Sequence, residues 1–255
     1  MSNDLNQDAA KELVAQTAGK TYDDIAHPTA HAIGQIVSFI PRTVKVWLGK
    51  WEKWILNGEY AIKETEKLLE EKLKHISEDK IVEPEPYVAV PAIQQLSYSL
   101  DSKELRELYA NLLASSMNAD KKSEVHPAFV DIIKQLSPDE AKLLRFLSYQ
   151  PVIPLVENRQ KSSDGKGYTV LEKYHLSISN GVLEIPQNKP VYIENLMRLQ
   201  LIEIPADTHY TTESLYTPLE TNVAFVGIQN EFITYNRKII NITPFGKQFV
   251  KICQY

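Results

Sequence analysis

The sequence predicts a mainly α-helical protein, in which a helical N-terminal and central region is followed by a small C-terminal winged-helix-like α+β unit. Apolar residues recur at spacings of three and four through much of the first 149 residues, which is the period of an amphipathic helix. Beyond residue 167 the helical signals weaken and β-branched and aromatic residues become more frequent. We therefore divide the chain into a flexible N-terminal arm (1–20), a helical domain (21–149), a linker or loop (150–167) and a winged-helix-like domain (168–255).

The first helical elements are expected between residues 33 and 77. Residues 33–56 form an amphipathic segment in which Pro41 separates two helical stretches. Residues 58–77 are very polar and carry only a narrow apolar seam, which predicts a helix that packs on one side. Three prolines within residues 78–91 then predict an extended connector.

The strongest helical signals lie in the central region. Asp101 with Glu104 resembles a capping box at the start of one helix, and His126-Pro127 starts a second. Ser137-Pro138-Asp139-Glu140 combines an N-cap serine, a proline at N1 and an acid at N3, and starts a third. The inward-facing residues of these helices form the predicted core: Leu105, Leu108, Tyr109, Leu112, Leu113, Met117, Phe129, Val130, Ile133, Leu136, Leu143, Leu144, Phe146 and Leu147.

The C-terminal part predicts a different arrangement. Residues 157–167 are polar and contain two glycines, which is typical of a loop. A helix that opens at Pro190 is followed by a short strand at 201–204, a long variable stretch, a second strand at 237–243 and a final helix that Thr243 caps. This order is the outline of a winged-helix unit.

Composition excludes several classes of protein. The 255 residues carry a net charge of −5, which does not favour bulk binding of polyanions. Only nine glycines are present, which disfavours glycine-rich phosphate loops, and the single cysteine cannot form an internal disulfide. Since the first residues are polar and no apolar run approaches the length of a membrane span, we expect a cytoplasmic protein.

One stretch has the composition of a contact surface. All three tryptophans of the chain fall in a single predicted helix, where they alternate with basic residues. The set consists of Arg42, Lys45, Trp47, Lys50, Trp51 and Trp54. This pattern is typical of an amphipathic helix at a membrane surface. It also suits a helix packed on protein with its lysine stems along the edge, and we favour this internal or partner packing over membrane contact.

A metal site is not expected. Asp23, His27 and His31 are four residues apart and would share one helical face, as metal ligands can. Pro28 interrupts the continuity between them, and the sequence offers no matching ligand cluster elsewhere. A surface or capping role is therefore the better interpretation, and the sequence indicates no cofactor.

Catalytic residues are not evident either. His126 could act as a general base beside Asp131 or Glu124, but it precedes the proline of a helix start and no nucleophile accompanies it. Cys253 lies on the apolar face of the last helix, which predicts a buried and inert thiol. Gly165-Lys166-Gly167 lacks the spacing of a phosphate loop. We expect no enzymatic activity and no small-molecule substrate.

The winged-helix outline raises the question of DNA binding. The balance of basic and acidic side chains in this part of the chain helps to answer it. Residues 189–240 contain four basic side chains, Lys189, Arg198, Arg237 and Lys238, against six acidic ones. Affinity for a duplex comes largely from several Lys and Arg at the phosphates. The sequence therefore favours contact with protein, or dimerisation, over nucleic acid.

A run of short motifs is similar to a known family. The matching features are Val90-Pro91-Ala92, Ala110-Asn111-Leu112-Leu113-Ala114, Val125-His126-Pro127, Leu136 to Ala141, and Thr243-Pro244-Phe245-Gly246. They resemble the abortive infection alpha family of bacteria, most closely over residues 84–148 and least over 150–235. The resemblance implies a role in phage defence, in which an infected bacterium is shut down before the phage spreads. It implies no catalytic residues.

The sequence thus predicts a non-enzymatic, defence-associated protein that binds another macromolecule, with a protein partner or self-association favoured. Two alternatives stay open. The first is a regulator that binds DNA through the winged-helix-like unit. The second is a peripheral effector at the inner membrane face that acts through residues 33–56.

Overall fold

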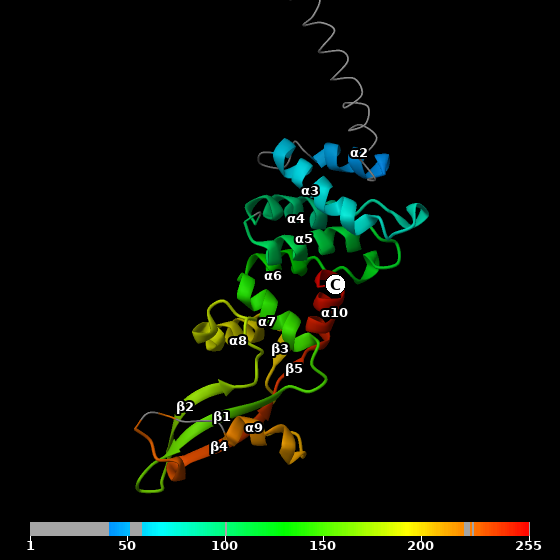
Figure 1. Ribbon diagram of the computed structural model, residues 1–255. Coiled ribbons are helices and arrows are strands. Elements are labelled where there is room, and N and C mark those ends of the chain that lie inside the picture. The colour runs from blue at the N-terminus through cyan, green and yellow to red at the C-terminus, as the bar shows by residue number, and fades with distance from the viewer. Residues whose placement is uncertain (1–40, 52–57, 100, 222–224, 226, 255) are drawn as a thin grey trace, which may run out of the picture. The chain divides into compact units, whose positions relative to one another are not determined.

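The computed structural model describes residues 41–51, 58–99, 101–221, 225 and 227–254 (Figure 1). The expected arm at 1–20, the helical stretch at 33–40, and Asp23, His27 and His31 lie outside these residues. Residues from Arg42 onward form one compact unit.

Successive helices pack on one another in the first half of this unit (Figure 1). Helix α5 lies at the centre of this packing, because α3, α4, α6, α7 and α10 all contact it. Nine consecutive residues of α5, Leu108 to Ser116, are buried. The helices are α2 (Arg42–Trp51), α3 (Gly58–Leu73), α4 (Pro86–Tyr98), α5 (Lys103–Ser116), α6 (Ala128–Lys134) and α7 (Pro138–Ser148). Apart from Leu105 and Phe146, which are half-buried, every residue of the predicted core is buried.

The expected connector at 78–91 is wrong in its second half, because α4 begins at Pro86 and continues through Pro91. Pro86 lies in the first turn, where no backbone N–H is needed. Pro91 costs the helix one internal hydrogen bond. Burial of five apolar side chains of α4 outweighs that cost: Val88, Ala89, Ala92, Ile93 and Leu96.

The caps of the central helices are close to those predicted. Ser137 and Glu140 form the expected capping box at the start of α7. Helix α5 is capped by Ser102, whose Oγ accepts a hydrogen bond from the Leu105 N–H, so the predicted cap at Asp101 is wrong by one residue.

A three-stranded antiparallel sheet follows, in the order β2-β1-β4. Its strands are β1 (Pro154–Lys161), β2 (Tyr168–His175) and β4 (Ile233–Ile239). The expected linker at 150–167 is therefore wrong over residues 154–161, which form the central strand β1. The polar residues that indicated a loop are buried and paired: Glu157 contacts Lys238 and Arg159, and Asn158 donates to Glu172. The loop that remains is the β1–β2 turn, in which Gly165 adopts φ +69°.

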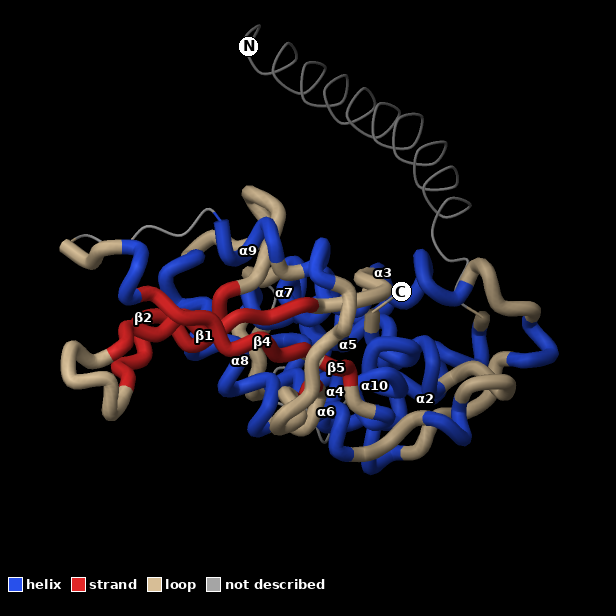
Figure 2. Tube along the Cα trace, turned by 90° about the horizontal axis from the view of Figure 1, so that it is seen from below, coloured by secondary structure: helices blue, strands red, loops and turns tan. Residues whose placement is uncertain are grey.

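The predicted strands at 201–204 and 237–243 do pair, but in part. Strand β3 (Ile202–Glu203) pairs antiparallel with β5 (Asn241–Ile242). Residues 237–239 of the second expected strand belong instead to β4, which pairs with β1 in the larger sheet. Helix α9 (Thr217–Thr221), which lies between β3 and β4 in the sequence, is next to β1 (Figure 2). The side chains of Tyr216 and Leu219 pack on Val156 of β1. The winged-helix assignment stays a prediction.

Two further helices connect the sheets to the helical part. Helix α8 (Lys189–Arg198) contacts both β2 and α7. Helix α10 (Pro244–Cys253) is capped by Thr243 and packs against α5. The residues expected to form a separate C-terminal domain are thus in direct contact with the centre of the helical part.

Candidate interaction surface

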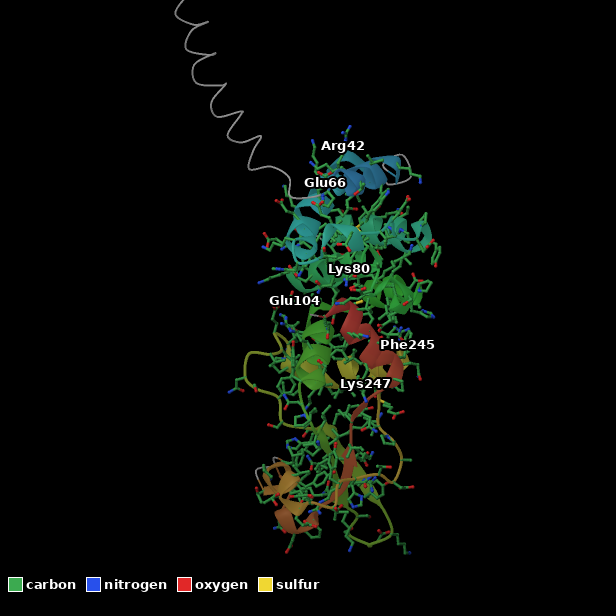
Figure 3. All side chains as sticks on the ribbon, turned by 90° about the vertical axis from the view of Figure 1, so that its right-hand side faces the viewer. Arg42, Glu66, Lys80, Glu104, Phe245 and Lys247 are labelled. Carbon is green, nitrogen blue, oxygen red and sulfur yellow. The ribbon has the colours of Figure 1, made fainter. Side chains whose placement is uncertain are left out.

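Helix α2 contains all but Trp54 of the contact residues that the sequence predicts, and it has a buried face and an exposed face. Val44 and Leu48 are buried, on the side where α2 contacts α3. Arg42 and Lys50 are exposed, and Figure 3 shows Arg42 pointing away from the helices below it. Lys45 and Trp47 are half-buried between the two faces. The side chain of Trp51 and all of Trp54 lie outside the described residues.

The exposed face of α2 also carries an apolar residue, Val46, whose side chain is 62% exposed. Lys50 is anchored, because its Nζ lies 3.1 Å from Oε1 of Glu83. Lys122 in turn binds the carbonyl oxygen of Glu83 at 2.8 Å and Glu85 at 2.9 Å. These contacts fix the end of α2 beside the start of α4.

Helix α4 presents two large aromatic side chains to solvent. Tyr87 is 63% exposed and Tyr98 is 62% exposed. They are eleven residues apart, which places them on one face of the helix about 16 Å from each other. We define the α2–α4 surface as Arg42, Val46, Lys50, Tyr87 and Tyr98. The two tyrosines were missed in the sequence, although their spacing, with the polar Gln94 between them, is a signal that could have identified this face.

Three basic residues of the C-terminal part, Lys189, Arg237 and Lys238, are engaged within the chain. Lys189 pairs with Glu172 at 3.0 Å, and Lys238 pairs with Glu157 at 2.6 Å. Arg237 binds the carboxylates of Glu213 and Glu220. The hydrogen bond from His175, together with Lys189, lowers the pKa of Glu172 to about 2, despite its partial burial. These side chains therefore serve internal pairing rather than a free cationic face.

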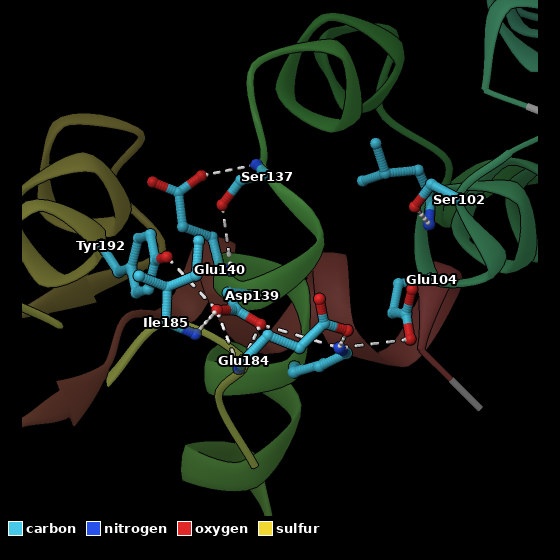
Figure 4. A network of polar contacts seen from close by, with 10 residues as sticks. Ser102, Glu104, Ser137, Asp139, Glu140, Glu184, Ile185 and Tyr192 are labelled. Atoms are coloured by element: carbon cyan, nitrogen blue, oxygen red, sulfur yellow. Dashed lines mark hydrogen bonds and ion pairs between the residues drawn. The ribbon is translucent and has the colours of Figure 1, made fainter. Parts of the chain in front are cut away.

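A buried carboxylate joins α7 to the segment before α8. Asp139 is only 5% exposed. It accepts hydrogen bonds from the backbone N–H groups of Glu184 at 3.0 Å and Ile185 at 2.9 Å, and from the hydroxyl of Tyr192 at 3.2 Å (Figure 4). Burial alone would raise the pKa of Asp139, but these hydrogen bonds outweigh it and hold the pKa below its usual value. Lys142 lies 3.6 Å away and adds to the effect.

The two residues considered for chemistry have structural positions. His126 is exposed, and its Nδ1 accepts a hydrogen bond from the Ala128 N–H at 3.1 Å, so it caps α6. Its ring also packs edge-on against Phe245. Cys253 is fully buried, and burial raises the pKa of its thiol.

Two other features, a metal-ligand cluster and a membrane-spanning helix, are absent from the described residues. No group of three or more His, Cys, Asp or Glu side chains in the described ranges could hold a metal ion. Among the helices of the described part of the chain, none is both long and apolar enough to cross a bilayer.

Comparison with known proteins gives a single result. Residues 57–253 match the model of a protein family described as abortive infection alpha. No curated protein and no solved structure matches the chain. The matched range runs from the start of α3 to the end of α10, so it takes in α4 but leaves out α2.

Proposed function

We propose, since the chain belongs to the abortive infection alpha family, that it acts in the defence of bacteria against phage by binding another protein through the α2–α4 surface. The observation that carries the proposal is the exposure of Tyr87 and Tyr98 on one face of α4. Tyrosine is enriched at the centres of protein interfaces, where it buries a large area at little cost in conformational entropy.

The rest of this surface suits a protein partner. On α2, Arg42 and Lys50 provide exposed charged positions, and Val46 adds exposed apolar area. Interfaces of this kind combine an apolar or aromatic centre with a polar rim. A second copy of the chain or a different protein could provide the complementary face.

We include in the proposal that the chain acts by binding rather than by catalysis. The ionisable side chains considered for chemistry have other roles, because His126 caps a helix and Cys253 is buried with a raised pKa. Asp139 is held by hydrogen bonds in the joint between α7 and α8. These positions support a structural use of each group.

Binding to DNA receives less support. Lys189, Arg237 and Lys238 are paired with carboxylates, and phosphate contact would have to break those pairs. Retention on DNA that falls steeply with salt concentration would favour the regulator instead.

Binding to a membrane through α2 also receives less support. The apolar residues Val44 and Leu48 are turned inward, and they are not available to lipid. Co-sedimentation with anionic liposomes, abolished by Trp51→Ala plus Lys50→Glu, would favour the membrane effector.

Site-specific crosslinking tests the proposal directly. A photoreactive amino acid replaces Tyr87 or Tyr98 in the full chain, and cells that carry the gene are irradiated during phage infection. We expect a discrete crosslinked protein band from both positions. The matched control is the same replacement at Tyr149, which directly follows α7 and is 66% exposed. Bands of equal intensity from all three positions, or from none, would contradict the proposal.

A further inference from the structure

Strand β2 lies at one edge of the three-stranded sheet, whose order is β2-β1-β4 (Figure 1). Toward its C-terminal end β2 contacts α8, where Glu194 binds Lys173 at 3.0 Å and Tyr174 at 3.3 Å. Residues 168–170 precede this contact and are exposed. Within the described part of the chain, the first half of β2 therefore has a neighbouring strand on one side only.

The pairing of β2 with β1 determines which backbone groups of β2 point outward. The Ser162 N–H donates to the carbonyl oxygen of Gly167 at 2.9 Å, and this pair continues the register that β1 and β2 keep as far as Thr169. Opposite residues of an antiparallel ladder alternate between hydrogen-bonded and non-hydrogen-bonded pairs. Thr169 is thus bonded to β1, whereas the N–H and C=O groups of Tyr168 and Val170 point away from β1, toward the open edge.

The side chains of this edge are suited to pairing with another strand. Tyr168 is 56% exposed and Val170 is 45% exposed. The guanidinium of Arg159 lies over the ring of Tyr168 at 3.9 Å and holds the ring against the sheet. Residues 167–171 contain no charged residue and no proline, which are the features by which many proteins protect an exposed edge strand.

We infer that this edge pairs with the same edge of a second copy of the chain, in an antiparallel arrangement with Thr169 on the twofold axis. Tyr168 then exchanges backbone N–H···O bonds with Val170 of the second copy, and Val170 does the same with Tyr168 of the second copy. The two sheets join into one continuous sheet, which is a known way for strand edges to associate.

A second copy is the partner that fits, because the strand is complementary to itself in this register. Each Tyr168 lies opposite a Val170, which is an aromatic and β-branched pair, and the two Thr169 residues lie opposite each other. Both kinds of cross-strand pair stabilise antiparallel sheets. The charged residues next along the register, Lys166 of one copy and Glu172 of the other, have opposite signs. This edge is separate from the α2–α4 surface, so the inference goes beyond the proposed function and does not rest on it.

Sedimentation equilibrium of the full chain tests the inference. We expect a concentration-dependent dimer with a Kd below about 0.1 mM. Thr169→Lys and Thr169→Glu each place two like charges opposite each other at the axis, so each should weaken dimerisation by about threefold or more. An equimolar mixture of the two variants brings opposite charges together there and should associate about tenfold more tightly than either variant alone.

The matched control is Thr234→Lys, which changes an exposed threonine on β4, the other outer strand of the sheet, and should leave dimerisation unchanged. Tyr87→Ser plus Tyr98→Ser should also dimerise like the wild-type chain, and circular dichroism checks that each variant is folded. A wild-type chain that stays monomeric at about 0.1 mM, or a Thr169→Lys variant that dimerises like the wild type, would overturn the inference. A mixture that associates no better than its components, or loss of the dimer in either control, would overturn it as well.

Discussion

The side chain of Asn111 on α5 donates a hydrogen bond from Nδ2 to the carbonyl oxygen of Cys253 at 2.9 Å, across 142 positions of sequence. Ser115 makes the same kind of contact with the carbonyl of Ile252 at 3.0 Å. The last carbonyls of a helix have no partner within it, so α5 supplies the acceptors at the end of α10 with donors. This contact explains why a helix at the centre of the core carries polar residues.

Replacing Asn111 with Leu should therefore destabilise the fold. The change leaves the buried carbonyl of Cys253 without a donor, which costs about 1–3 kcal/mol. Urea denaturation would measure the loss as a lower midpoint. Asn180→Ala, at an exposed position in the loop after β2, is the control and should have no effect. Equal midpoints for the two variants would refute the role of Asn111.

Ser137→Ala should lower the free energy of unfolding by about 1 kcal/mol. The substitution removes the oxygen that accepts the Glu140 N–H and opens the capping box of α7. Denaturant titration measures the change, with the exposed Ser179→Ala as control. An unchanged midpoint for Ser137→Ala would show that the cap does not stabilise the helix.

Stability should fall in acid because of Glu172 and Asp139. Both carboxyls have a pKa in the folded state below the usual value, so the stability they contribute is present above their unfolded pKa and is lost as pH falls through the folded pKa. For Glu172 this window runs from about pH 4.5 to about pH 2.

Glu172→Gln should reduce the difference in denaturation midpoint between pH 6 and pH 3. The exposed Glu231→Gln is the control and should retain the full difference. If Glu172→Gln retains it as well, the pairing with His175 and Lys189 does not stabilise the fold as described.

Two glycines should respond to alanine in opposite directions. A Cβ on Gly246 would lie 2.0 Å from the backbone oxygen of Leu201, so Gly246→Ala must displace the start of α10 from the backbone at Leu201 and should cost roughly 1–3 kcal/mol or more. A Cβ on Gly49 of α2 would meet nothing within 4 Å. Gly49→Ala should stabilise the helix by up to about 1 kcal/mol. Thermal denaturation of both variants checks the pair, and a shift in the same direction would contradict it.

The sequence predicted the elements whose signals are local. The capping box of Ser137 and Glu140 and the apolar stripes of α5, α6 and α7 are set by neighbouring residues, and the structure confirms them. The family resemblance rested on the same region and is confirmed.

The elements that the sequence missed depend on distant partners. Strand β1 contains Glu157, Asn158 and Arg159, which indicate a loop unless Lys238 and Glu172 are known to pair with them. The exposed face of α4 was not predicted, because Pro86 and Pro91 indicated an extended connector. They form instead part of the helix that carries Tyr87 and Tyr98.

Phage plating on bacteria that carry the gene tests the central claim most directly. Cells with the wild-type gene should reduce plaque formation relative to cells without it, and Tyr87→Ser plus Tyr98→Ser should abolish the reduction at an unchanged level of folded protein. Tyr149→Ser plus Tyr168→Ser, which alters two tyrosines exposed elsewhere, should retain it. Full protection by the Tyr87 and Tyr98 variant would contradict the claim that this protein acts through the α2–α4 surface.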